Sequence, residues 1–466
     1  MPPIPTLPPM DPEAARQALS DLGAQAVECV LGDFTSVARG KRVHRDDFLA
    51  LGGCRLPSVV LGLTLTGGEP EPVFGPMLPR QYSDLTLQPD LATLAPRPGR
   101  PAEASVLCEP GGRWWSEHHA REVDASELCP RSALRRVLAR FEAEGLTARV
   151  APELEFFLLQ RDEAGGRITL DSARAHPGAM ARESACEAYS LERASHFDAY
   201  FDALYAACAT MGIPLSGHAH EAALSQFEVN FHPGPPLAQA DAVHRFKRLA
   251  REIAAQHGFL ASFAPKPFLD QPGTGMHWHF SVQRHDAAWP HLFAEPDGAD
   301  SAELGHFVAG LQDQAPAAMA FLAPHDMAYD RITRSDASPS HASWGGEDRS
   351  LAFRIPTSGP ASRRIENRLP GGDANPYLTV AVTLGLGLAG LQAAKAPLPT
   401  CNERHALARS LPDALNALDA SSTLRDLLGA PLIDLYVAIK RHEQAERAAL
   451  DDPRQHWDLR HLIELA

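Results

Sequence analysis

The sequence predicts an α+β protein built from two domains. Its 466 residues exceed what one ordinary hydrophobic core organises. The stretch from about residue 24 to 108 has the pattern of short strands separated by Gly and Pro, and after it strand patterns alternate with helix patterns. A Gly-Gly pair and a charged stretch near 110–128 suggest the boundary. We expect a Pro-rich N-terminal arm, a small β-rich domain and a large α/β domain, over residues 1–20, 21–118 and 119–466.

The composition is that of a soluble globular protein, with 44% apolar and 22% charged residues. Lys and Arg number 43 against 58 Asp and Glu, and the net charge of −15 disfavours nucleic acid or an anionic membrane surface as a partner. The seven cysteines are scattered without a CxxC pair, so neither a zinc knuckle nor a disulfide framework is indicated, and a cytoplasmic location is expected. The proline-rich first ten residues hold no basic residue, unlike a signal peptide.

In the first domain, β-branched and apolar residues between turn signals predict strands at Val27–Leu31, Ser58–Thr66 and Ser105–Leu107. A helix is expected over Pro130–Glu144, because proline suits the first helical position and apolar residues then recur at helical spacing until Gly145.

The large domain carries further strand and helix patterns. Strands are expected at Ala148–Leu159, Ser225–Phe231, Gly275–Val282, Ser350–Ile355 and Arg363–Leu369. Helices are expected at Ser195–Met211, Gln239–His257, Ala302–Phe321 and Pro376–Ala394. The last of these is apolar enough to suggest a membrane span, but its three glycines, its polar residues and the opening Asn375-Pro376 favour a buried helix.

Acidic and imidazole side chains recur on single faces of several predicted strands. Glu153 and Glu155 alternate with Leu154 and Phe156, so both carboxylates face one way and repel unless a cation lies beside them. A solvated strand face would explain this pair alone, and a lone histidine is usually a core residue. The pattern recurs, however, at the positions Glu221, Glu228, His277, His279, Ser281 and Glu366.

This set of side chains indicates a divalent-metal enzyme that uses ATP. Carboxylates with one or two imidazoles and no thiolates suit Mg²⁺ or Mn²⁺ rather than zinc. Arg364 and Arg368 lie on the same strand as Glu366, which implies an anionic second guest such as a phosphate or carboxylate. Metals facing arginines are what phosphoryl transfer needs, because its catalysis consists mainly of positioning and charge neutralisation.

The same residues lie in motifs that resemble those of the glutamine synthetase family. KPFLDQPGTGMHWHFS at 266–281 resembles the family's ATP-binding signature at every defining position. Further agreement comes from PELEF, HEAALSQFE, RSLAFRIP, RIENRLP, NPYL and DFTSVARGK, which start at residues 152, 220, 349, 364, 375 and 33. The resemblance covers the chain from about residue 24 to its end.

The resemblance implies a β-grasp domain followed by a catalytic domain with a curved antiparallel sheet. It also implies rings of six subunits, possibly stacked to twelve, with each active site between two subunits. The family reaction uses ATP to form γ-glutamyl phosphate from glutamate, which an amine then attacks to give an amide. Two or three Mg²⁺ or Mn²⁺ ions are the implied cofactors, and ATP is a co-substrate.

The resemblance also implies roles for individual residues. Glu155, Glu221 and Glu228 match the ligands of one metal, and Glu153, His277 and Glu366 match those of the metal that holds the ATP phosphates. Arg331 and Arg368, with Gly273, match the glutamate site, and Arg349 and Arg354 match residues on the transferring phosphoryl group. His279, Ser281 and Arg364 match nucleotide-binding positions.

The chain departs from the family where ammonium would bind. The flap glutamate that deprotonates ammonium falls on Ala337 in a gapless alignment, and the second acid, from a neighbouring β-grasp domain, falls on Thr64. Without a carboxylate, neither binding nor deprotonation of ammonium has an obvious agent, which favours a bulkier, less strongly cationic amine. Asp336 is a candidate substitute base, although a loop aspartate commonly has no such role.

Three hypotheses follow from the sequence. The leading one is a ligase that joins glutamate to an amine other than ammonia. The second is a glutamine synthetase that uses ammonia with a relocated base, Asp336. The third is a catalytically silent ring protein that binds nucleotide or glutamate, and the complete set of metal ligands argues against it because unused buried carboxylates are costly.

Overall fold

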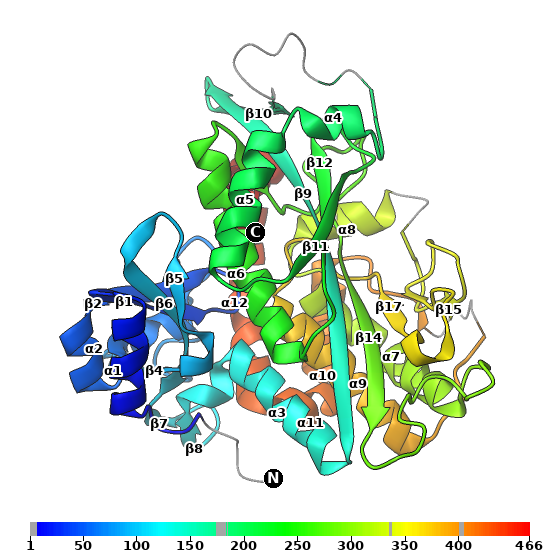
Figure 1. Ribbon diagram of the computed structural model, residues 1–466, viewed down its shortest axis with the longest axis horizontal. Helices are drawn as coiled ribbons and strands as arrows, with labels where there is room; N and C mark the ends of the chain where they lie inside the picture. The colour runs from blue at the N-terminus through cyan, green and yellow to red at the C-terminus, as the bar shows by residue number, and fades with distance from the viewer. Residues whose placement is uncertain (1–6, 174–182, 184, 335–337, 400–404) are drawn as a thin grey trace.

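The computed structural model describes residues 7–173, 183, 185–334, 338–399 and 405–466. In these residues two main β-sheets divide the chain: strands up to residue 111 form a smaller sheet, and strands from residue 146 onward form a larger one. Figure 1 shows the smaller sheet, in blue, beside the larger part of the molecule, through which the long strand β9 runs diagonally. The α+β fold class with a curved, mainly antiparallel catalytic sheet is confirmed.

The smaller sheet has the strand order β2-β1-β6-β4-β3, with β5 paired to β6. Strand β1 runs parallel to β6, and the other pairs are antiparallel. Its strands are β1 (Ala26–Gly32), β2 (Ala38–His44), β3 (Cys54–Pro57), β4 (Asp84–Pro89), β5 (Ala95–Arg97) and β6 (Arg100–Gly111).

Two expectations about the N-terminal region are corrected. Helix α1 (Pro12–Asp21) occupies residues assigned to the arm, because Asp11 caps it and Ala15 and Leu19 are buried in the core. The predicted strand Ser58–Thr66 is instead a 3₁₀ turn followed by a loop. Its backbone bonds locally rather than to a neighbouring strand, as when Gly62 N–H donates to the Val59 carbonyl oxygen at 3.0 Å.

A buried ion network joins the smaller sheet to the helices behind the larger one. Arg131, at the start of helix α3 (Pro130–Ala143), is 2% exposed and donates to Glu109 of β6 at 2.8 Å. It also donates to Asp241 at 2.9 Å and to Asp90 at 2.7 Å. Tyr377 OH donates to the same Asp241 at 2.8 Å. A buried guanidinium bonded to three carboxylates fixes the packing of these elements.

The larger sheet has the order β11-β12-β9-β14-β17-β16-β15, with β10 and β13 also paired to β9. Only β15 and β16 pair in parallel among its described strands. The strands are β9 (Leu146–Ala164), β10 (Arg167–Ser172), β11 (Leu215–His220), β12 (Gln226–Phe231), β13 (Leu260–Ser262), β14 (Met276–Arg284), β15 (Trp344–Gly345), β16 (Phe353–Arg354) and β17 (Ile365–Asn367).

Most of the strands and helices expected in the large domain are present within a few residues of the predicted bounds. The strand expected over Ser350–Ile355 shortens to β16, because Asp348 Oδ1 accepts hydrogen bonds from the backbone N–H and the hydroxyl of Ser350 and makes a turn there. The remaining helices are α2 (Arg45–Leu51), α4 (Leu191–Ser195), α5 (Asp198–Thr210), α6 (Pro236–Gln256), α7 (Ala302–Leu322), α8 (Asp326–Thr333), α9 (Pro376–Ala393), α10 (Leu411–Ala420), α11 (Ser422–Leu428), α12 (Ala430–Ala448) and α13 (Ile463–Leu465). Short 3₁₀ turns lie at Leu91–Thr93, Ala125–Leu128 and Pro360–Ser362, and a π-helical segment spans Arg454–Leu462.

Helix α9 is the apolar segment that could be mistaken for a membrane span. By length and hydropathy it is the one described helix that passes that test, yet 78% of it is buried inside the protein. Its glycines explain the packing: a Cβ on Gly390 would lie 2.2 Å from the His306 carbonyl oxygen, and one on Gly310 of α7 would lie 2.1 Å from the Leu386 oxygen. The two backbones therefore meet where only glycine fits, and α9 is a core helix.

Candidate active site

The side chains predicted as metal ligands lie on adjacent strands of the larger sheet. Strands β12, β9, β14 and β17 are consecutive in its order. The register places Glu228 opposite Glu155, and Glu153 opposite His277. Opposed residues on neighbouring strands project from the same face. Residues far apart in the sequence therefore converge on one face, while Leu154 is buried on the other.

Glu366 of β17 extends this row of polar side chains. The register places it opposite His279 of β14 and Arg354 of β16. Glu366 is 1% exposed, Arg354 Nε lies 2.9 Å from its Oε2, and Arg368 Nη1 lies 2.5 Å from its Oε1. Two guanidinium groups thus compensate one buried carboxylate.

Two groups of described side chains bring their ligand atoms within 4.8 Å of one another. One contains Glu153, His277 and Glu366, and the other contains Glu153, Glu155 and Glu228. His277 Nδ1 lies 3.1 Å from Glu153 Oε1. Because Glu153 belongs to both groups, they adjoin and form one continuous acidic site. Carboxylate oxygens with a single imidazole are the donor set that Mg²⁺ and Mn²⁺ prefer.

Glu221, which the sequence places with Glu155 and Glu228, lies just after β11 and outside both groups. Its Oε2 accepts a hydrogen bond from Ala222 N–H at 3.0 Å. Its charge nevertheless reaches the site: burial is the main cause that raises the pKa of Glu155 and Glu228, and Glu221 adds to both shifts.

Burial and neighbouring charges shift the pKa values of the site's acids in opposite directions. Burial opposes ionisation of Glu153, but hydrogen bonds from His277 and His279 outweigh it and hold its pKa well below the usual range. Burial, and then the negative charge of Glu153, raise the pKa of Glu228 to about 9. Carboxylates this close cannot all be ionised without a cation. The geometry therefore fits a bound divalent metal.

The residues predicted to bind nucleotide line a single pocket next to this acidic site. His279, Ser281 and Arg364 line a cavity of about 460 Å³ together with Glu153 and Asn230. Arg364 Nε donates to His279 Nδ1 at 3.2 Å. The cavity is thus lined by a guanidinium group, that of Arg364, and by a candidate metal ligand, Glu153. This combination suits a phosphate-bearing ligand.

The arginines predicted to hold glutamate and the phosphoryl group are partly engaged with the protein itself. Arg331 is 8% exposed and donates to the carbonyl oxygens of Arg368, Leu369 and Pro370 at 3.0–3.2 Å. Arg368 Nε donates to the carbonyl oxygen of the exposed Arg349 at 3.0 Å. Arg331 therefore shapes the segment that carries Arg368, in addition to any contact with substrate.

Gly273 lies where the chain passes close to this arginine. Its carbonyl oxygen accepts from Gln226 Nε2 at 2.9 Å, and the same Nε2 donates to Glu155 Oε2 at 3.2 Å. A Cβ on Gly273 would lie 2.3 Å from the Pro265 carbonyl oxygen and 2.9 Å from the Arg331 side chain. Only glycine fits here, so Gly273 is held between Arg331 and the acidic site.

Thr64 is fully buried in a tight loop of its own chain. Its Oγ1 accepts a hydrogen bond from Gly68 N–H at 2.7 Å and lies 3.1 Å from Thr66 Oγ1. The next residue, Leu65, donates its N–H to Glu443 of α12 at 2.6 Å. The hydroxyl of Thr64 is therefore occupied in closing its loop. Asp336 and Ala337, the other two residues predicted for the amine site, lie outside the described residues.

A chain of buried charges behind this loop was not found by sequence reasoning. Asp373 Oδ2 lies 2.8 Å from His325 Nδ1, and His325 Nε2 lies 3.1 Å from Lys440 Nζ. Lys440 donates to Glu443 Oε2 at 2.8 Å, and all four residues are at most 2% exposed. The only signal in the sequence is a Lys–Glu pair three residues apart in an otherwise apolar helical pattern.

Comparison with known proteins identifies the family. The profile of the glutamine synthetase catalytic domain matches residues 127–460. The chain belongs to the glutamine synthetase family. Enzymes of this family are carbon–nitrogen ligases that use ATP, a divalent metal, glutamate and an amine or ammonia, which agrees with the acidic site and the adjoining pocket.

Several relatives in the family resemble most of the chain. It is 30% identical over 445 residues to the Gamma-glutamylputrescine synthetase PuuA of Escherichia coli, covering 90% of this chain and 88% of the relative. It is 31% identical to a Glutamate--isopropylamine ligase of Pseudomonas sp (77% and 76% covered) and 31% identical to a Glutamine synthetase of Halobacterium salinarum (79% and 81% covered). Among solved structures, a GmaS/ADP complex matches with a TM-score of 0.76 at 26% identity, covering 95% of this chain and 97% of that one.

Proposed function

We propose that this member of the glutamine synthetase family is an ATP-dependent ligase that joins glutamate to an amine other than ammonia through γ-glutamyl phosphate. The observation that carries the proposal is an acidic site that brings together five of the six predicted metal ligands beside the pocket predicted for nucleotide, combined with the absence of an acid at both predicted ammonium-site positions, Thr64 and Ala337. Two relatives whose names specify glutamate–amine ligation support it.

In this proposal the chain's residues position charge rather than form bonds. His279, Ser281 and Arg364, which line one pocket, would hold ATP there. Mg²⁺ or Mn²⁺, two or three ions held by the two acidic groups together with Glu221, would neutralise charge on the phosphates. Arg354 and Arg349 would steady the transferring phosphoryl group, and Arg331, Arg368 and Gly273 would orient glutamate, as the family resemblance implies.

The amine step is where this chain differs from an ammonia-using enzyme. Ammonium must be bound as a cation and lose a proton before attack, which requires a nearby carboxylate. The position of the flap glutamate is Ala337, and the loop from Leu63 to Gly67 holds no acid. A site without an acid favours an amine with an apolar or hydroxylated body, such as an aralkyl or hydroxyalkyl amine.

The test is an amine panel with purified protein, Mg²⁺, ATP and glutamate, read as phosphate release with mass-spectrometric detection of the amide. Ammonium, isopropylamine, ethanolamine, benzylamine and putrescine would be compared. We expect at least one organic amine to give a kcat/KM at least about tenfold above that of ammonium. The proposal would be refuted if ammonium were the only amine that gave phosphate release, or if no amine of the panel gave any.

A restored acid provides the matched variant. Ala337→Glu is expected to raise turnover with ammonium and lower turnover with the preferred amine, because it adds a carboxylate and removes space. Substitution to Gln at the same position is the control for size, and it should lower organic-amine turnover without helping ammonium. Equal effects of Glu and Gln would contradict a role for charge at this position.

A glutamine synthetase that uses ammonia is the second candidate, favoured by relatives of that name at 30–33% identity. It requires a base elsewhere, and Asp336 is the candidate. Glutamine formation at millimolar ammonium that Asp336→Ala abolishes would establish it. Binding of ATP and glutamate with no γ-glutamyl hydroxamate in the presence of hydroxylamine would instead indicate a catalytically silent protein.

Assembly into a ring of six subunits, possibly stacked to twelve, and a cytoplasmic location complete the proposal. The assembly rests on the family resemblance, and the location rests on the scattered cysteines without a CxxC pair. Light scattering of the purified protein tests the assembly, and a monomer that is active at assay concentration would contradict it. The two-domain division at about residue 118 is likewise a proposal, supported by the separate sheets on either side of it.

A further inference from the structure

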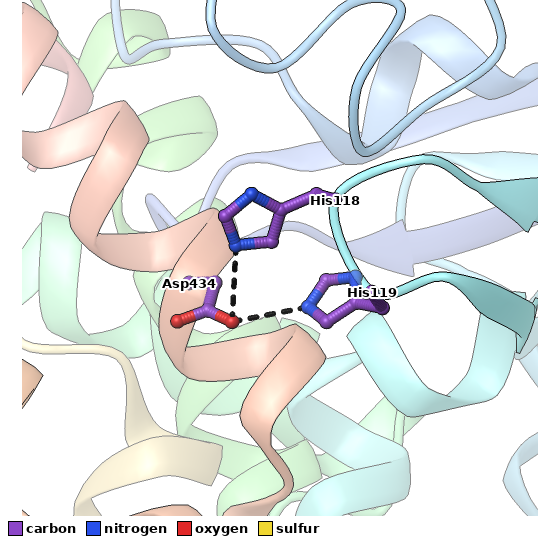
Figure 2. A group of neighbouring side chains, drawn as sticks. All are labelled: His118, His119 and Asp434. Carbon is purple, nitrogen blue, oxygen red and sulfur yellow. Dashed lines mark hydrogen bonds and ion pairs between the residues drawn. The ribbon is translucent and has the colours of Figure 1, made fainter.

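A cluster of two histidines and one aspartate lies away from the residues assigned to the acidic site. His118 and His119 lie on the turn between β7 (Arg113–Ser116) and β8 (Arg121–Asp124), and Asp434 lies on α12. Their ligand atoms are within 4.8 Å of one another. Figure 2 shows both imidazole rings directed at the same carboxylate oxygen. The distances to Asp434 Oδ2 are 3.4 Å from His118 Nε2 and 3.0 Å from His119 Nε2.

The carboxylate of this cluster is held in place from its other side. Arg425 Nη1 donates to Asp434 Oδ1 at 2.6 Å, which leaves Oδ2 for the two imidazoles. The same guanidinium donates through Nη2 to Asp419 at 2.7 Å, so Arg425 has a second counter-ion of its own. Hydrogen bonds that fix a carboxylate in this way are the usual support around metal ligands.

His119 is oriented by a neighbouring hydroxyl group. Ser116 Oγ lies 2.9 Å from His119 Nδ1 and donates to the Pro76 carbonyl oxygen at 3.1 Å. When the Ser116 hydroxyl accepts from Nδ1–H, Nε2 carries the lone pair that a metal ion needs. Without an ion, Nε2 lies at hydrogen-bond distance from Asp434 Oδ2, at 3.0 Å.

The cluster is open to solvent on one side. The His118 side chain is 43% exposed, whereas those of His119 and Asp434 are 10% and 13% exposed. An ion can therefore reach the three ligand atoms from solvent, and a water molecule can complete its coordination. Two imidazoles and a carboxylate with an open position suit Zn²⁺, Co²⁺ or Ni²⁺ rather than Mg²⁺.

We propose that His118, His119 and Asp434 bind one divalent transition-metal ion of the zinc class. The ion would join the β7–β8 turn to helix α12 and thereby tie the N-terminal part of the chain to the C-terminal part. Such a site adds stability by mass action, because the ligands are brought together only in the folded chain. The proposal does not depend on which amine the ligase uses.

The test uses the full chain after removal of metals with a chelator. Co²⁺ serves as the probe, added in the presence of excess Mg²⁺, with its visible absorption and its bound stoichiometry measured by elemental analysis. We expect the wild type to hold one Co²⁺ per chain more than a His118→Ala/His119→Ala variant. Asp434→Asn, which keeps its contact with Arg425, should weaken this binding at least about tenfold.

Controls separate the site from the acidic one and from misfolding. His118→Ala alone removes an exposed ligand, so the chain should fold normally, keep its Mg²⁺-dependent ligase activity and still lose the extra Co²⁺. His44→Ala removes a histidine that faces one carboxylate, Asp46, and should leave binding unchanged. Equal Co²⁺ stoichiometry and spectra in the wild type and in His118→Ala would overturn the proposal and identify the cluster as hydrogen-bonded only.

Discussion

Metal binding at the acidic site is expected to release a proton from Glu228. Burial, and then the charge of Glu153, raise the pKa of Glu228 to about 9, so in the metal-free chain this carboxyl is protonated at pH 7. A divalent metal bound by Glu153, Glu155 and Glu228 requires the ionised form of each ligand. The proton on Glu228 must therefore leave when the metal binds.

The size and direction of the effect follow from the pKa. Up to about one proton per chain should be released at pH 7 by Glu228, and affinity for Mg²⁺ or Mn²⁺ should rise by up to about tenfold per pH unit below pH 9. The stability of the metal-free chain depends on pH in the opposite direction to its metal affinity. Because the folded state keeps a proton that the unfolded state loses, metal-free stability should fall as the pH rises from 4.5 to about 9.

Isothermal titration calorimetry measures this release. Mn²⁺ is titrated into metal-free protein at pH 7 in two buffers with different ionisation enthalpies, and the difference in observed heat gives the number of protons. Glu228→Gln is the matched variant: it has no proton to lose, so its release should be smaller by about one, and its affinity should be weaker. The same heat in both buffers, or equal proton release from Glu228→Gln, would refute the reasoning.

The remaining predictions concern stability, measured as the free energy of unfolding in urea. Arg131→Gln should destabilise the chain by about 3–5 kcal/mol, because buried carboxylates lose their partner, whereas Arg113→Gln at an exposed ion pair should change stability by less than about 0.5 kcal/mol. Glu443→Gln should destabilise by a similar 3–5 kcal/mol, since buried Lys440 loses its counter-ion; an effect no larger than that of Arg113→Gln would contradict this. Lys247→Met should stabilise the chain by about 2 kcal/mol at pH 7 and by less at pH 10. Burial lowers the Lys247 pKa to about 7, so folding at pH 7 works against the protonated lysine of the unfolded chain, and this cost shrinks as the pH rises; a larger gain at pH 10 would contradict this sign.

The sequence predicted the members of the acidic site because each strand shows its own alternation of polar and apolar residues. Glu153 and Glu155 could be assigned to one face from their spacing alone. Which strands lie side by side is set by pairing between distant segments, and this is why the opposition of Glu228 to Glu155 and of Glu366 to Arg354 became visible only in the structure.

The strand predicted at Ser58–Thr66 was wrong because the backbone there makes hydrogen bonds that the sequence pattern does not indicate. Ser58–Thr66 has the composition of a strand, yet its N–H groups bond within their own turn and the loop is held by Glu443, far away in the sequence. The chain of charges from Asp373 to Lys440 could not be predicted for the same reason. Its residues come from separate segments, and no pattern within any one segment indicates that they pair.

The two ion pairs of Glu366 have a consequence for how the metal and the substrates bind. Arg354 and Arg368 both form ion pairs with this carboxylate, which is also a candidate metal ligand together with Glu153 and His277. A cation that takes the carboxylate oxygens weakens both ion pairs and frees two guanidinium groups for anionic substrates. Metal and anions should therefore bind with positive cooperativity, and by reciprocity ATP and glutamate should tighten the metal by the same factor. Initial-rate kinetics at varied metal and glutamate should then show each lowering the apparent KM of the other.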